Sequence, residues 1–169
     1  MVEVIGFHGT DKVFDKFDSK AEKRSTGTNG GFWFSDCPYV AHTYTNHAGY
    51  NEKAYLKALK NGDLFGESIG NSSIIKAKIV FQKPFIFDAD GNSSGDLTGM
   101  RKTNNHEVSQ GLVNCFTISD LYIEAIENGY DGIIVKNVED IGGCSGYLWE
   151  EKGSLLSTIY GVKTKKQIF

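Results

Sequence analysis

Short stretches of strand-forming residues at both ends of the chain constrain its fold more than any other feature. Residues 2–7 (VEVIGF) and 31–36 (GFWFSD) mix β-branched and aromatic residues with smaller or charged ones, as strands do. Residues 130–140 (YDGIIVKNVED) and 156–162 (LSTIYGV) show the same pattern near the other end. Because helical patterns lie mostly between these strands, we expect an α+β fold.

Two helix signals stand out between the strands. Residues 37–48 (CPYVAHTYTNHA) follow two possible N-caps, Ser35 and Asp36, and carry proline only in the first turn, where a helix tolerates it. Residues 118–129 (ISDLYIEAIENG) have Ser119 as the expected cap and end on a glycine. We therefore expect a helix over each segment.

The middle of the chain supplies the remaining elements. Residues 73–81 (SIIKAKIVF) predict a strand, and residues 85–90 (FIFDAD) predict its continuation or an edge piece after a proline. Residues 51–62 form a further segment bounded by a capping asparagine and a terminating glycine. Residues 90–112 are polar and glycine-rich, which is typical of a long connection. Since the sequence has no repeat and no linker, we expect one domain over residues 1–169.

Composition argues against several classes of function. The chain of 169 residues has a formal net charge of -3, which gives no support for binding nucleic acid. Its one basic cluster, KTKK at 163–166, is typical of a strand edge or turn. The three cysteines fit neither a CxxC metal pattern nor a disulfide framework, which indicates a reducing compartment; they are Cys37, Cys115 and Cys144. Without a signal peptide or membrane span, we expect a cytoplasmic monomer.

Patterns for metals and phosphate loops are absent. Residues 88–96 (DADGNSSGD) resemble a calcium loop, but Ser93 and Gly99 stand where that loop needs glycine and glutamate. The histidines lack zinc spacing, and neither GxGxxG nor a P-loop occurs. We therefore expect no metal.

Four motifs in order point to a family. These are HGT (8–10), GFWFSDCPYVAHTY (31–44), YDGIIVKN (130–137) and STIYGVKTKKQIF (157–169). Together they resemble the ADP-ribosyltransferase fold of the diphtheria-toxin and poly(ADP-ribose) polymerase branch, and most of all the small domains carried by phage and mobile-element polyvalent proteins. The resemblance implies a split two-sheet, β-sandwich-like core with a few helices and a central cleft that holds NAD, the substrate.

The resemblance also implies roles for single residues. His8 would bind the adenosine ribose, Gly9 would hold the nicotinamide amide through its backbone, and Thr10 takes the place of a hydroxyl residue. Trp33 and Tyr44 match the two aromatics that sandwich the nicotinamide, and stacking on each is worth about 0.5–2 kcal/mol. The further NAD-binding residues implied are Gly31, Phe34, Ser35 and Thr158, whereas Ala41 stands where the family often has a serine.

The catalytic acid is not where the resemblance implies it should be. The polymerase pattern has glutamate just before the final strand, but this chain has Ser157, Thr158 and Ile159 there. One hypothesis takes the carboxylate from Glu139 or Asp140, with Asp140 favoured. Glu150 and Glu151 are a second source, although two exposed acids in a loop is the simpler interpretation. Another hypothesis is that catalysis runs without an acid.

A missing glutamate argues against polymer elongation and leaves single transfer. We therefore expect an NAD-dependent mono-ADP-ribosyltransferase that modifies a protein acceptor, as a phage or bacterial effector acting on a host or defence protein. The residues expected to carry catalysis are His8, Tyr44 and Asp140. The alternatives are an NAD glycohydrolase, in which water replaces the acceptor, and a degenerate domain that binds NAD or a partner without turnover.

Overall fold

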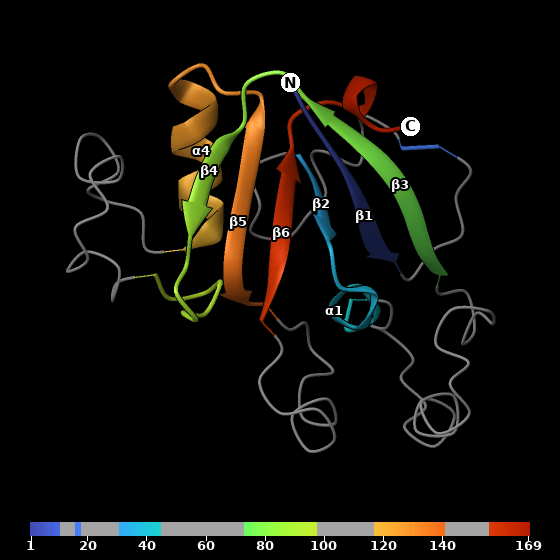
Figure 1. Ribbon diagram of the computed structural model, residues 1–169, viewed down its shortest axis with the longest axis horizontal. Helices are drawn as coiled ribbons and strands as arrows, with labels where there is room; N and C mark the ends of the chain where they lie inside the picture. Colours follow the sequence, from blue (N-terminus) through green and yellow to red (C-terminus); the bar gives the residue numbers. More distant parts are fainter. Residues whose placement is uncertain (11–15, 18–30, 45–72, 98–116, 141–155) are drawn as a thin grey trace.

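A computed structural model describes residues 1–10, 16–17, 31–44, 73–97, 117–140 and 156–169. In these ranges the chain forms a six-stranded mixed sheet in the order β3-β1-β2-β6-β5-β4 (Figure 1). The strands are β1 (Val2–Thr10), β2 (Phe32–Ser35), β3 (Ser73–Phe81), β4 (Phe85–Asp88), β5 (Gly132–Glu139) and β6 (Leu156–Val162), and the helices are α1 (Pro38–His42), α4 (Ile118–Glu127) and the 3-10 helix η3 (Lys165–Gln167). The α+β class is confirmed.

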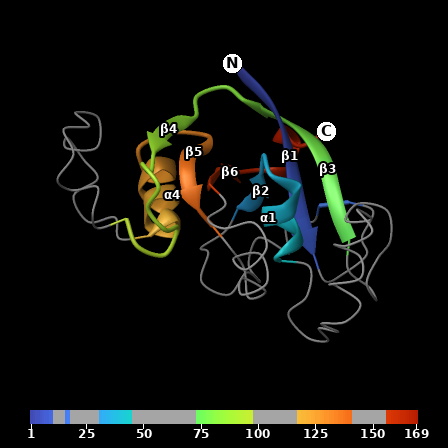
Figure 2. The same ribbon diagram turned by 60° about the horizontal axis from the view of Figure 1, so that its bottom comes forward.

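The sheet consists of two groups of strands with a narrow join. β1 and β3 pair antiparallel along their whole lengths, from Val2↔Phe81 to Thr10↔Ser73. β2, β6, β5 and β4 form the second group, in which only the β4–β5 pair is parallel. β1 meets β2 at a single pair, Phe7↔Ser35. In Figure 2 the β1–β3 pair and the β4–β5 pair lie on opposite sides of the molecule, with β2 and β6 between them. The structure therefore has one sheet where two were expected, and its weakest join is at β1–β2.

Each face of the sheet carries its own core. We call the side packed against α4 the α4 face, where Leu121 and Tyr122 of that helix meet Ile133, Val135 and other buried residues of β5. The opposite face is built on a second cluster of buried residues, which are Phe32, Phe34, Ala77, Ile79, Phe81, Ile134, Tyr160 and Val162. Because side chains alternate along a strand, neighbours such as Ile133 and Ile134 serve different cores. Burying each large apolar side chain contributes about 1.5–3 kcal/mol.

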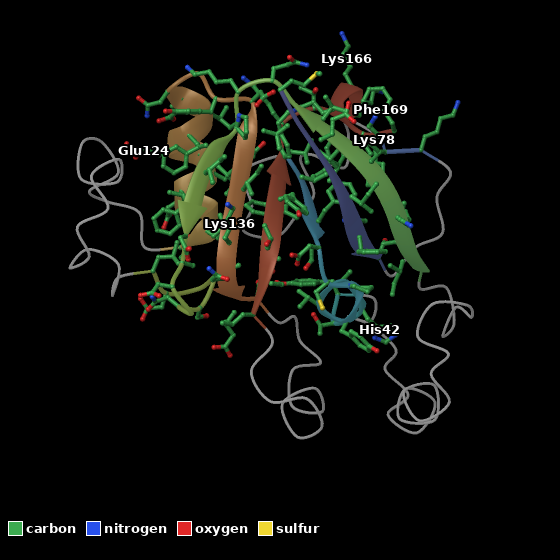
Figure 3. All side chains as sticks on the ribbon, in the orientation of Figure 1. His42, Lys78, Glu124, Lys136, Lys166 and Phe169 are labelled. Atoms are coloured by element: carbon green, nitrogen blue, oxygen red, sulfur yellow. The ribbon has the colours of Figure 1, made fainter. Side chains whose placement is uncertain are left out.

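The outer edge of β3 is partly covered by the end of the chain. Phe169 and Lys78 exchange two backbone hydrogen bonds, of 2.8 and 2.9 Å, and both side chains are labelled close together in Figure 3. Residues 163–166 lie in the turn and 3-10 helix that lead there, as expected. The opposite edge of the sheet is β4, so residues 85–88 are an edge strand rather than a continuation of β3.

The two helices begin one or two residues away from the positions expected for their caps. α4 is capped by Thr117, whose hydroxyl accepts from the Asp120 N–H while the Asp120 carboxylate accepts from the Thr117 N–H. Ser119 lies inside the helix, so the prediction that it caps was wrong: the reciprocal capping box outcompetes a lone hydroxyl. Gly129 ends this helix with φ +81°, as predicted.

α1 is shorter than its predicted span, because only residues 38–42 are helical and Thr43 and Tyr44 form a turn. Its N-cap is Cys37, without a side-chain cap. Ser35 acts one step earlier, accepting from the Cys37 N–H at 3.0 Å. Asp36 instead accepts from the backbone of β6 at Thr158. Residues 45–48 and the segment 51–62 lie outside the described residues.

In the described ranges, neither helix has the length and apolar character needed to cross a bilayer.

Replacing Thr117 with Ala should lower the free energy of unfolding by about 1 kcal/mol, because the first turn of α4 loses its cap. Ser119→Ala is the matched control and should change stability by much less. Urea unfolding followed by circular dichroism measures both. An equal loss from both variants would contradict the capping box at Thr117.

Candidate functional site

The site begins where β1 passes α1. A Cβ at Gly9 would overlap the carbonyl oxygen of Ala41 and would lie 3.3 Å from the Cβ of Tyr44. Glycine is therefore required at position 9 for the strand to pass this close to the helix. The backbone at Gly9 therefore packs directly against the end of α1 and against Tyr44.

Tyr44 reaches across the α4 face to the end of β5. Its hydroxyl donates to Asp140 Oδ1 at 2.8 Å, although the two residues are 96 positions apart. The Ser94 hydroxyl donates to the same Oδ1 at 2.6 Å. The backbone N–H of Ser94 also donates to the Glu139 carbonyl at 2.8 Å, which fixes this loop against β5. Two donors thus fix one carboxylate oxygen of Asp140.

Burial and the neighbouring carboxylate keep Tyr44 protonated. Burial raises the pKa of the Tyr44 phenol far above its usual value, and the Asp140 charge and hydrogen bond raise it further. Tyr44 is therefore a neutral donor at every physiological pH. Its ring, meanwhile, packs at the border of the α4-face core.

Trp33 lies on β2, directly opposite a glycine of β6. Its partner on β6 is Gly161, where an added Cβ would lie 3.2 Å from the indole ring. The indole packs against Tyr122 of α4 with ring centroids 5.3 Å apart. The indole Nε1 is buried and has no hydrogen-bond partner among the residues with described positions.

His8 bonds to the backbone of Trp33. The Nδ1 lies 2.8 Å from the Trp33 carbonyl oxygen, and since a carbonyl can only accept, Nδ1 carries the hydrogen. Extending the Phe7↔Ser35 register would pair Gly9 with Trp33. The His8 imidazole bonds to the Trp33 carbonyl instead, and the pairing between β1 and β2 ends at this point.

The His8 ring is enclosed by aromatic rings on the opposite face. Its centroid lies 5.4 Å from that of Phe17 and 5.5 Å from that of Phe34. Burial lowers the pKa of His8 below 6.5, and the hydrogen bond to the Trp33 carbonyl offsets part of that effect. His8 therefore favours the neutral form.

The other residues expected to bind NAD make contacts within the protein. Gly31 has φ +96°, and a side chain there would overlap the Tyr122 hydroxyl. Thr10 ends β1. The Thr158 N–H donates to the Asp36 carboxylate, and the Asp36 N–H donates to the Thr158 carbonyl. Phe34 is buried in the opposite-face core, while Ser35 supports the start of α1. Their contacts with a ligand stay predictions.

The structure thus brings together some of the expected residues and separates others. Gly9, Trp33, Tyr44 and Asp140 gather on the α4 side, whereas His8 contacts Phe34 on the opposite face. Glu139 follows Val138, a residue of the α4-face core, so its side chain starts from the opposite face. Glu150 and Glu151 lie outside the described residues. Sequence reasoning gave no site role to Ser94, which lies in the rejected calcium-like loop, or to Tyr122.

Metal ligands do not gather in this region. Among the residues with described positions, no group of three or more His, Cys, Asp or Glu is placed to hold a metal ion. Cys37 is a free thiol, and the other two cysteines lie outside the described ranges.

Comparison with known families gives one match. The sequence model of a family described as "ADP-Ribosyltransferase in polyvalent proteins" matches residues 4–168. Searches of curated proteins and of solved structures found no match. The family resemblance noted from the four motifs is therefore confirmed over almost the whole chain.

Gly9→Ala should destabilise the protein by about 1–3 kcal/mol, because the new methyl group must displace the Ala41 carbonyl or the strand. Gly95→Ala is a matched control, since a Cβ there meets its nearest neighbour at 3.8 Å. Chemical denaturation gives both values. A Gly9→Ala protein as stable as the control would show that β1 and α1 are not in contact here.

Stability should fall on mild acidification. The folded-state pKa values of His8 and His42 lie below 6.5, so the unfolded chain binds protons more readily. The contribution of the two neutral histidines to the free energy of unfolding is then fully present above pH 6.5 and is lost as the pH drops below that value. His8→Asn keeps a donor for the Trp33 carbonyl but cannot titrate, so it should flatten part of this dependence. Urea unfolding at several pH values tests this, and an unchanged slope would contradict it.

Proposed function

This chain belongs to the family of ADP-ribosyltransferases found in polyvalent proteins, and from this we propose that it is an NAD-dependent mono-ADP-ribosyltransferase acting on a protein acceptor. The observation that carries the proposal is the hydrogen bonding of the Asp140 carboxylate. The hydrogen bonds that it accepts from described residues, Tyr44 and Ser94, both go to Oδ1. We propose that Oδ2 accepts a hydrogen bond from a substrate.

An oriented carboxylate suits the chemistry of NAD. When the bond between nicotinamide and ribose C1′ breaks, positive charge develops on the ribose, as in glycoside hydrolysis. A fixed negative group near the ribose stabilises that charge without reorganising during the reaction. We assign this role to Asp140 Oδ2, with the 2′-hydroxyl of the nicotinamide ribose as its partner.

The nicotinamide would lie by Gly9 and the two aromatics. Because the β1–β2 ladder ends at Phe7↔Ser35, the backbone of Gly9 beyond it is not committed to β2. An N–H and C=O pair without a side chain suits a carboxamide. The Tyr44 and Trp33 rings offer π faces to the cationic nicotinamide ring. The family resemblance assigns the adenosine ribose to His8, but its ring lies on the opposite face, enclosed by Phe17 and Phe34, so we do not place it in this nicotinamide site.

The transfer needs no reagent other than NAD and the acceptor. The electron pair of the C1′–N bond passes to the nicotinamide ring nitrogen, which loses its positive charge as nicotinamide leaves. A nucleophilic atom of the acceptor bonds to C1′ and releases its proton to solvent. Tyr44 and Ser94 hold Asp140 in place throughout.

Single transfer and an effector role follow from the same premise. Ser157, Thr158 and Ile159 supply no carboxylate at the start of the last strand, which supports mono- rather than poly-ADP-ribosylation. Membership of a family that occurs in polyvalent proteins supports a phage or bacterial effector. A host or defence protein in the cytoplasm is the proposed acceptor.

The proposal is tested by incubating the protein with NAD labelled in its adenosine half, together with a bacterial lysate. A transferase gives labelled protein, a glycohydrolase gives only free labelled ADP-ribose, and a binding domain gives neither. The second and third outcomes would overturn the proposed transfer reaction. Labelled chains of several ADP-ribose units would overturn single transfer.

Asp140→Asn should lower the labelling rate on the order of a hundredfold. The amide oxygen can still accept from Tyr44 and Ser94, so the variant removes the charge and keeps the contacts. Glu139→Gln is the matched control, because this carboxylate starts from the other face of β5. A large loss in Glu139→Gln with a normal rate in Asp140→Asn would move the catalytic role to Glu139.

A further inference from the structure

A buried hydroxyl on β6 has no hydrogen-bond partner among the described residues. The side chain of Ser157 is 5% exposed, and its Oγ makes no hydrogen bond to the part of the chain that the structure describes. Leaving a buried hydroxyl unsatisfied destabilises a fold, and buried polar groups are nearly always paired. An unpaired group of this kind in a folded protein calls for a ligand or a water.

Strand register places this hydroxyl beside the Asp140 network. Ser157 pairs directly with Val138 of β5, and Val138 belongs to the α4-face core. Paired residues point to the same face, so Ser157 faces the α4 side as well. Asp140 lies two residues beyond Val138, about 7 Å along the strand. Its bonds to Tyr44 and Ser94 place its carboxylate on that same side.

The two groups are chemically complementary to a pair of hydroxyls. Asp140 Oδ2 can only accept, because it is a carboxylate oxygen, and the bonds from Tyr44 and Ser94 go to Oδ1. The Ser157 hydroxyl can donate and accept. A ribose carries neighbouring 2′- and 3′-hydroxyls, each of which can also donate and accept. One ribose can therefore satisfy the carboxylate oxygen and the buried hydroxyl together.

We propose that Ser157 is a substrate-binding residue whose hydroxyl bonds the 3′-hydroxyl of the nicotinamide ribose while Asp140 takes the 2′-hydroxyl. This inference rests on the proposed use of NAD. Ser157 thereby occupies the strand where the family resemblance implied a carboxylate, and it contributes binding while Asp140 contributes the charge.

The test compares Ser157→Ala with Ser157→Thr, which keeps the hydroxyl. Calorimetric titration with NAD should show about 3- to 10-fold weaker binding to Ser157→Ala and near-normal binding to Ser157→Thr. An NAD analogue that lacks the 3′-hydroxyl of the nicotinamide ribose should bind wild type and Ser157→Ala equally. Without NAD, Ser157→Ala should unfold at the same or a higher temperature than wild type, because it loses an unpaired buried hydroxyl.

The outcomes separate this inference from the proposed function. If wild type transfers ADP-ribose and Ser157→Ala binds NAD as tightly as wild type, Ser157 binds a structural water and the inference alone fails. Weaker binding that Ser157→Thr does not restore, or a loss of stability in Ser157→Ala without NAD, also overturns it. If wild type does not bind NAD, the proposed function and the inference fail together.

Discussion

The hydrogen bond from His8 to the Trp33 carbonyl determines where the pairing between β1 and β2 ends. In a regular antiparallel ladder that carbonyl would face the neighbouring strand and pair with its backbone. Here the imidazole takes it at 2.8 Å, and β1 and β2 are joined only at Phe7↔Ser35. The sheet is continuous in hydrogen bonding, yet it divides into two groups of strands at this point. Two sheets were expected, whereas the structure has one sheet with a narrow join at this point.

Close packing around glycines positions the elements on either side of this join. Gly9 lets β1 pass against the Ala41 carbonyl, and Gly161 lets the rings of Trp33 and Tyr122 lie over β6. Gly31 makes room for the Tyr122 hydroxyl at the start of β2. Since each of these contacts excludes even a methyl group, α1 and α4 are held at fixed positions relative to the strands. Tyr44 can then reach Asp140 from the turn that follows the five-residue helix α1.

The sequence predicts the strands well because alternation and composition are local properties. The spans at 73–81 and 156–162 agree with β3 and β6 residue by residue. The caps were harder, because Thr117 and Ser119 are both acceptable caps and only the reciprocal bond with Asp120 decides between them. Strand pairing is not local either. Nothing in the sequence around Ser94 indicates that it will donate to a carboxylate 46 positions away.

The antiparallel pairing of β5 and β6 explains how a catalytic carboxylate can change strands. The end of β5 lies beside the start of β6, through the pairs Val138↔Ser157 and Glu139↔Leu156. A group just after β5 and a group at the start of β6 therefore reach the same region of the α4 face. If Asp140 supplies the charge, β6 is free to carry a small hydroxyl residue where the family resemblance implies glutamate. Asp140 lies beyond the end of β5, where strand pairing no longer fixes the backbone. The hydrogen bonds from Tyr44 and Ser94 are then needed to hold its carboxylate in place.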